Sequence, residues 1–156
     1  MPTDLPNRTA CLSWLFWQES GASFLGGGFG HFYRYAPEPI EYAINRYTME
    51  AKRQIDVLDQ HLAKHEYLCG DNYSIADIAN WAWYGQVVLG DVYDAIEFLE
   101  ADSYEHVNRW AKQIATRSAV QRGVMVNKTS GPLEKQLRER HDASDFQNRT
   151  QDKLES

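Results

Sequence analysis

Two groups of side chains in this sequence have types and spacings that could bind a small molecule. Arg46 lies four residues before Glu50 in a strongly periodic segment, and its planar guanidinium could hold a carboxylate. A run of glycines at residues 26–28 is followed at once by aromatic side chains, with His31 among them. Such a cluster could form an apolar wall for a bulky or thiol-bearing electrophile.

The residue pattern leaves Arg46 two interpretations. It pairs with an acidic neighbour such as Glu50, because side chains four apart meet on a helix surface, or it points into a cleft and holds a carboxylate there. The spacing alone favours the ion pair.

The glycine run does not predict a phosphate-binding loop. It lacks a preceding strand, the GxGxxG spacing and the lysine of a P-loop, so we predict a tight connection that ends one helix and leads to the next. Phe29, His31 and Tyr33 then either pack this connection against a helical bundle or line a pocket. Both interpretations stay open.

Metal binding and nucleophilic catalysis find little support. His61 and His65 have the spacing of two ligands on one helix face, but no third ligand is suggested nearby and the glutamate of HExxH is absent. We therefore expect them to complement the carboxyl end of a helix, and we predict no metal. No serine or cysteine pairs recognisably with a histidine, so no catalytic residue is predicted.

Composition narrows the class of protein. The 156 residues are 43% hydrophobic and carry 16 basic against 22 acidic side chains, a net charge of −6. One domain with a real core is expected, and the negative balance argues against nucleic acid or an anionic membrane as a partner. Without a span of about 20 apolar residues or a signal peptide, and with two cysteines outside any CxxC motif, we expect a cytoplasmic protein.

Helical periodicity dominates the chain. Apolar residues recur every three or four positions from Ile40 to Leu62, which predicts one long amphipathic helix. Ser74 and Asp77 have the spacing of a capping box, followed by an apolar segment that we expect to run to about residue 88 before Gly90, with Trp83 in the core. Other helices are predicted at residues 7–24, after a cap at Asp102 or Ser103, at 119–124 and from Pro132.

The capping segment also carries a family resemblance. Ser74-Ile75-Ala76-Asp77, preceded by Leu68-Cys69-Gly70-Asp71, resembles the start of the core helix in the C-terminal domain of glutathione transferases. The resemblance to the bacterial nu-class enzymes extends over nearly the whole chain, through the segments Trp14-Leu15-Phe16-Trp17, Gly26-Gly27-Gly28-Phe29-Gly30-His31-Phe32-Tyr33, Tyr42-Ala43-Ile44-Asn45-Arg46-Tyr47 and His141-Asp142-Ala143-Ser144-Asp145-Phe146.

The resemblance implies an all-α fold, a glutathione transferase C-terminal-like helical bundle. Its expected extent is residues 7–141, with a remnant of an inter-domain linker at 1–6 and a polar tail at 142–156 that Phe146 could anchor. The thioredoxin-like N-terminal domain of such enzymes is missing from this sequence. The implied substrates are glutathione and a small electrophile or disulfide, and the full-length parent is expected to be a homodimer.

The resemblance also implies roles for particular residues. Arg46 falls where the family has an arginine that contacts bound glutathione, which reverses the preference for the ion pair. Glu19 falls where these enzymes usually carry a glutamine that helps to hold glutathione; a carboxylate cannot donate that hydrogen bond, unless Gln18 takes the role. The expected substrate pocket is formed by Trp17, Phe29, His31 and Tyr33.

We therefore expect the helical substrate-binding half of a glutathione transferase or glutathione-dependent disulfide reductase, inactive as an isolated fragment because the activating residue belongs to the missing domain. The alternative is a stand-alone helical module that binds other proteins through the exposed former domain interface.

Overall fold

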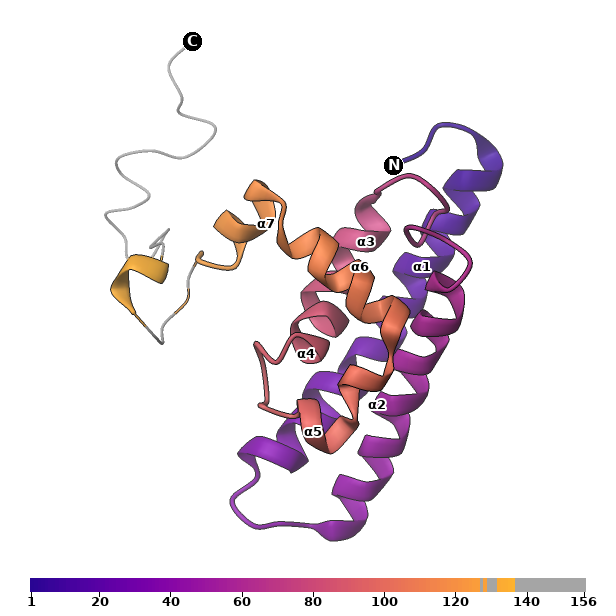
Figure 1. The fold of residues 1–156 in the computed structure, drawn as a ribbon. Coiled ribbons are helices and arrows are strands. Elements are labelled where there is room, and N and C mark those ends of the chain that lie inside the picture. The colour runs from indigo at the N-terminus through magenta and orange to yellow at the C-terminus, as the bar shows by residue number, and fades with distance from the viewer. Residues whose placement is uncertain (127, 129–131, 137–156) are drawn as a thin grey trace, which may run out of the picture. The chain divides into compact units, whose positions relative to one another are not determined.

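The computed structural model describes residues 1–126, 128 and 132–136 of the chain (Figure 1). Within these residues every regular element is a helix, and Tyr67 and Gly70 form an isolated bridge. The chain forms a first unit of residues 1–114 and a second unit that begins at residue 115. In the part of the chain that is described, no helix is long and apolar enough to cross a membrane.

The first unit contains two long helical segments and a set of shorter helices packed on them. α1 (Leu5–Ser23) continues into the π-helix η1 (Phe24–Tyr35), and α2 (Glu41–Leu62) returns alongside η1. The core helix is made of α3 (Ile75–Asn80), η2 (Trp81–Gly85) and α4 (Gln86–Val88), and α3 packs against α1. The unit ends with α5 (Ile96–Leu99), η3 (Ala101–Ser103) and α6 (Glu105–Ala115), whose last residue begins the second unit.

The expectation that the glycine run would end the first helix is wrong. The backbone keeps a helical course through residues 26–28 as part of η1, and none of these glycines has a positive φ. A Cβ on Gly28 would overlap the ring of Tyr47 from α2, and one on Gly30 would overlap the ring of Tyr93. The missing side chains let η1 pack closely on its neighbours, and this packing offsets the low helix propensity of glycine.

The long helix predicted from Ile40 is confirmed as α2. Its apolar stripe is fully buried only in the second half, at Ala51, Ile55, Leu58 and Leu62. Ile40, the residue before the helix, is 51% exposed.

The capping box at the start of the core helix is confirmed. The Ser74 hydroxyl accepts from the Ala76 N–H at 3.2 Å, and the Ser74 N–H donates to the Asp77 carboxylate at 2.8 Å. The helix continues to Val88, and Gly90 has the positive φ of +78° that terminates it as predicted. The interpretation of Trp83 as a core residue is wrong, since 38% of its surface is exposed.

Asp77 holds the core helix to two other segments. Its carboxylate is completely buried and also accepts from the Leu68 N–H at 2.9 Å, the Ser74 hydroxyl at 3.0 Å and the Trp110 indole N–H of α6 at 3.0 Å. A buried charge is tolerated only when its oxygens are hydrogen-bonded, and here the donors come from a loop, a cap and a neighbouring helix.

α6 begins with a cap that the sequence did not indicate. The N–H groups of its second and third residues, His106 and Val107, donate to the Asp59 carboxylate of α2 at 2.8 and 2.9 Å. The prediction that Asp102 or Ser103 caps this helix is wrong, because both residues lie in η3 and the helix begins at Glu105. The apolar stripe of α6 is completely buried at Val107, Trp110, Ala111 and Ile114.

The second unit has two short helices among its described residues. α7 (Ser118–Gly123) confirms the brief helix expected at residues 119–124, and the expected helix after Pro132 is a single 3₁₀ turn, η4 (Leu133–Lys135). His141, Phe146 and the predicted tail at 142–156 lie outside the described residues.

The packing of η1 predicts opposite effects for two adjacent glycines. Gly28→Ala is expected to lower the free energy of unfolding by about 1–3 kcal/mol, because the new methyl group meets the Tyr47 ring. Gly27→Ala is the matched control: nothing lies within 4 Å of its added Cβ, so stability should be unchanged or raised by up to about 1 kcal/mol. Urea denaturation of both variants measures the difference, and equal effects would contradict the packing described here.

Candidate functional site

Arg46 lies on α2 and is half exposed. Its guanidinium is 3.9 Å from the Glu50 carboxylate one turn later, and 52% of its side chain is open to solvent. The ion pair that the residue spacing favoured is therefore present. The glutathione contact implied by the family resemblance stays a prediction.

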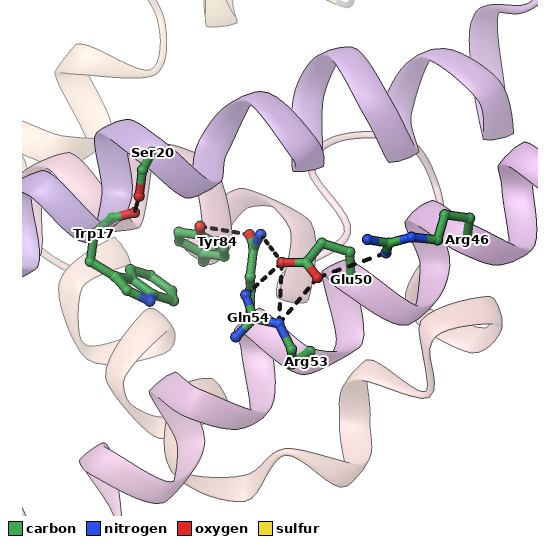
Figure 2. Close-up of polar contacts among 7 residues, drawn as sticks. All are labelled: Trp17, Ser20, Arg46, Glu50, Arg53, Gln54 and Tyr84. Carbon is green, nitrogen blue, oxygen red and sulfur yellow. Dashed lines mark hydrogen bonds and ion pairs between the residues drawn. The ribbon is translucent and has the colours of Figure 1, made fainter.

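Glu50 has closer partners than Arg46 (Figure 2). The Arg53 Nε donates to both carboxylate oxygens at 3.1 and 3.2 Å, and a terminal nitrogen of Arg53 donates to one of them at 2.5 Å. The Gln54 amide donates to the same oxygen at 2.9 Å. The Arg53 hydrogen bonds are the main cause that lowers the pKa of Glu50 below its ordinary value.

Behind Glu50, a second hydrogen bond connects the site to the core helix. The Tyr84 hydroxyl donates to the Gln54 side-chain oxygen at 2.9 Å, and both side chains are essentially buried. Burial raises the pKa of Tyr84 well above its ordinary value, so the phenol stays a donor. Gly21 of α1 makes room for this bond, since a Cβ there would approach the Tyr84 oxygen to 2.9 Å.

Tyr84 also contacts Trp17, one of the predicted pocket residues. The two rings lie 5.1 Å apart, and Trp17 packs edge-on against Trp14 at 5.3 Å. Figure 2 shows Trp17 of α1 on one side of Tyr84 and the chain of polar contacts that leads to Arg46 on the other. Glu19 follows two residues after Trp17 and is exposed. Trp17 is thus connected to Arg46 by a series of contacts that runs through Tyr84, Gln54 and Glu50.

The other predicted pocket residues lie in two further groups on η1. Phe29 is completely buried and stacks on Tyr33 at 5.0 Å, and Tyr33 packs against Phe98 at 4.6 Å. His31 is exposed and lies edge-on to Phe32 at 4.9 Å. A ligand could reach His31 and Tyr33 directly, whereas Phe29 supports them from within. Their role as a pocket wall stays a prediction.

A concave surface lies next to the Phe29 group. A pocket of about 310 Å³ is lined by Ala82, Trp83, Val87, Val92 and Tyr93. Tyr93 belongs to both features, because its ring is also edge-on to Phe29 at 6.1 Å. The partly exposed Trp83 forms part of the lining of this pocket.

The histidine pair is a packing feature. The His61 Nε2 lies 3.0 Å from the Leu68 carbonyl oxygen, and its ring contacts Trp14 at 4.7 Å and His65 at 4.5 Å. Burial lowers the pKa of His61, so its neutral form is favoured and Nε2 carries the proton given to Leu68. In the residues that are described, no group of three or more potential ligands could hold a metal ion.

Sequence reasoning missed part of this arrangement. Arg46 lies four residues before Glu50, and Arg53 and Gln54 lie three and four residues after it, which indicates contacts with Glu50 on a helix surface. Nothing in the sequence shows that Gln54 is buried. The contact of Gln54 with Tyr84 joins residues 30 apart and needs the tertiary fold.

Comparison with known protein families matches one segment of this chain. Residues 41–113, which include α2 and the core helix, match the family described as glutathione S-transferase, C-terminal domain. These residues form a glutathione S-transferase C-terminal domain. The described residues correspond to the all-helical C-terminal domain and contain no thioredoxin-like sheet.

Curated relatives are longer than this chain. The disulfide-bond oxidoreductase YghU of Escherichia coli is 63% identical over 98% of the chain, which covers 53% of that protein. An uncharacterized GST-like protein of Streptococcus mutans is 50% identical over 81% of the chain, which covers 49% of that protein. The chain thus spans about half the length of these relatives.

Solved structures of similar proteins were determined with glutathione. The glutathione transferase YghU from Streptococcus pneumoniae, complexed with glutathione, has a TM-score of 0.78 and 55% identity over 79% of this chain and 48% of its own. A glutathione transferase from Burkholderia graminis, with two glutathione molecules bound per subunit, has a TM-score of 0.76 and 32% identity over 83% of this chain and 54% of its own.

The buried histidine predicts a pH dependence of stability. Because the pKa of His61 is lower in the folded chain than its ordinary 6.5, the unfolded chain binds more protons below that pH and stability falls as pH decreases through this range. His61→Gln keeps a donor for Leu68 but does not titrate. Urea denaturation between about pH 7 and pH 5 should therefore show a weaker pH dependence for this variant. An unchanged pH dependence of stability in His61→Gln would contradict its assignment to His61.

Proposed function

We propose that this chain is the helical, substrate-binding half of a glutathione-dependent transferase or disulfide-bond reductase, and that it is inactive alone. The observation that supports this most is the identity of 63% over nearly the whole chain to a disulfide-bond oxidoreductase of which it covers 53%. The glutathione bound to similar solved structures supports glutathione as the ligand.

Arg46 is the residue of this chain best suited to glutathione. Glutathione carries two carboxylates at neutral pH, and a guanidinium matches a carboxylate with two parallel hydrogen bonds. The Arg46 side chain is 52% exposed and its ion pair with Glu50 is long, so it is accessible to a ligand. Glu19 is anionic and exposed, and would repel a glutathione carboxylate placed close to it.

The second substrate, an electrophile or a disulfide, would then meet the exposed aromatic surface of η1. His31 and Tyr33 are the reachable members of the predicted wall, and Trp17 lies on the neighbouring helix against Tyr84. These groups can bind and orient a substrate. Turnover would also need a residue that activates the glutathione thiol, and the family resemblance assigns that residue to the thioredoxin-like domain.

The experiment titrates glutathione and glutathione disulfide into the purified chain by calorimetry and measures turnover of a small disulfide. We expect a folded chain with binding in the micromolar to low millimolar range and no turnover above the uncatalysed rate. Measurable turnover would contradict the predicted inactivity. A folded chain that binds neither ligand would contradict the glutathione site and favour the protein-interaction module.

Arg46→Gln is the variant that tests the site, and we expect about a tenfold or greater loss of glutathione affinity from the removed charge-assisted hydrogen bonds. Lys64→Gln is the matched control, since it removes the same charge from an exposed position just beyond α2. Equal affinities for Arg46→Gln and the wild type would remove Arg46 from the site.

A further inference from the structure

Glu50 lies between two arginines on one face of α2, with Arg46 one turn before it and Arg53 one turn after it (Figure 2). The three side chains carry a net charge of +1 at neutral pH. The two arginines do not contact the Glu50 carboxylate equally closely. This difference bears on how an anion could bind to Arg46.

The Glu50 carboxylate is largely buried and therefore needs hydrogen-bond donors from the protein. Only 14% of its side chain is exposed, so water can satisfy little of it. It is also held in place from the core, because Gln54 donates to it at 2.9 Å and is itself fixed by the Tyr84 hydroxyl at 2.9 Å. Glu50 therefore cannot easily turn out to solvent.

Arg53 donates most of the hydrogen bonds that the Glu50 carboxylate accepts. It donates to both carboxylate oxygens at distances between 2.5 and 3.2 Å, which is the geometry of a strong charge-assisted pair. Arg46 lies at 3.9 Å, beyond hydrogen-bond distance. Consistently, Arg53 dominates and Arg46 contributes least among the causes that lower the pKa of Glu50.

We infer that Arg53 is a positioning residue that keeps Arg46 available to a ligand carboxylate by satisfying Glu50 in its place. This inference rests on the proposed role of Arg46 in binding glutathione. If Arg53 is removed, Glu50 still needs a donor, and Arg46 is the nearest cation. Arg46 would then pair closely with Glu50, and a ligand carboxylate would lose its partner although Arg53 never touches it.

The test uses the full chain and three variants, Arg53→Gln, Glu50→Gln and the double variant. The first readout is the rate at which phenylglyoxal modifies Arg46, measured by peptide mass spectrometry, because an arginine paired with a carboxylate reacts more slowly. We expect Arg53→Gln to slow this modification about two- to fivefold, the range of a partly exposed ion pair. The double variant should restore the rate, since no carboxylate remains to capture Arg46.

The second readout is glutathione affinity by calorimetry. Arg53→Gln should weaken binding by a similar factor and the double variant should recover it, while Lys64→Gln, which removes the same charge elsewhere, should change neither readout. A purely structural role of Arg53 predicts no recovery in the double variant. Far-ultraviolet circular dichroism and urea denaturation verify that all variants are folded.

The outcomes separate this inference from the proposed function. If Arg53→Gln leaves the modification rate of Arg46 unchanged or raises it, or if the double variant does not restore it, the inference is wrong whether or not glutathione binds. If Arg46→Gln has no effect on glutathione binding, the proposed site is wrong, and the modification rates still decide whether Arg53 controls the accessibility of Arg46.

Discussion

The buried carboxylate of Asp77 is the constraint on which the first unit depends. Its oxygens accept from the loop at Leu68, from the cap at Ser74 and from the Trp110 indole of α6, so one side chain joins the start of the core helix to the preceding loop and to a helix 33 residues further along the chain. Because the group is completely buried, each of these donors is needed to compensate for its lost hydration. The same helix that begins at this cap carries Tyr84, from which the polar contacts lead through Gln54 and Glu50 toward Arg46. The position of the candidate site thus follows from the way the core helix is fixed.

Local signals in the sequence predicted those elements whose cause is local. The Ser74 and Asp77 spacing indicated the cap, the apolar period indicated α2, and Gly90 indicated the end of the core helix, and all three are present. The errors arose where a distant residue decides the outcome. The chain stays helical through residues 26–28 because the rings of Tyr47 and Tyr93 pack against η1, and α6 is capped by Asp59 from another helix. Neither partner is visible in a local window.

The candidate site likewise contains some contacts that local spacing predicts and others that depend on the tertiary fold. The spacing of Arg46 and Glu50 predicted their ion pair, whereas the burial of Gln54 and its bond to Tyr84 could not be derived without the fold. The predicted pocket residues are brought together only in part, with Trp17 against Tyr84 and the Phe29 group on η1. The chain spans about half the length of its curated relatives. Its helices present an accessible arginine whose surroundings are fixed from the core.

The most direct test of this account is the free energy of unfolding of Asp77→Ala, measured by urea denaturation, with exposed Asp71→Ala from the preceding turn as control. Removal of the carboxylate leaves the Leu68, Ser74 and Trp110 N–H groups without their acceptor, and each buried donor left unsatisfied costs about 1–3 kcal/mol. The account predicts a loss of at least about 3 kcal/mol, or a chain that does not fold, with Asp71→Ala near the wild type. An Asp77→Ala variant as stable as the control would contradict it.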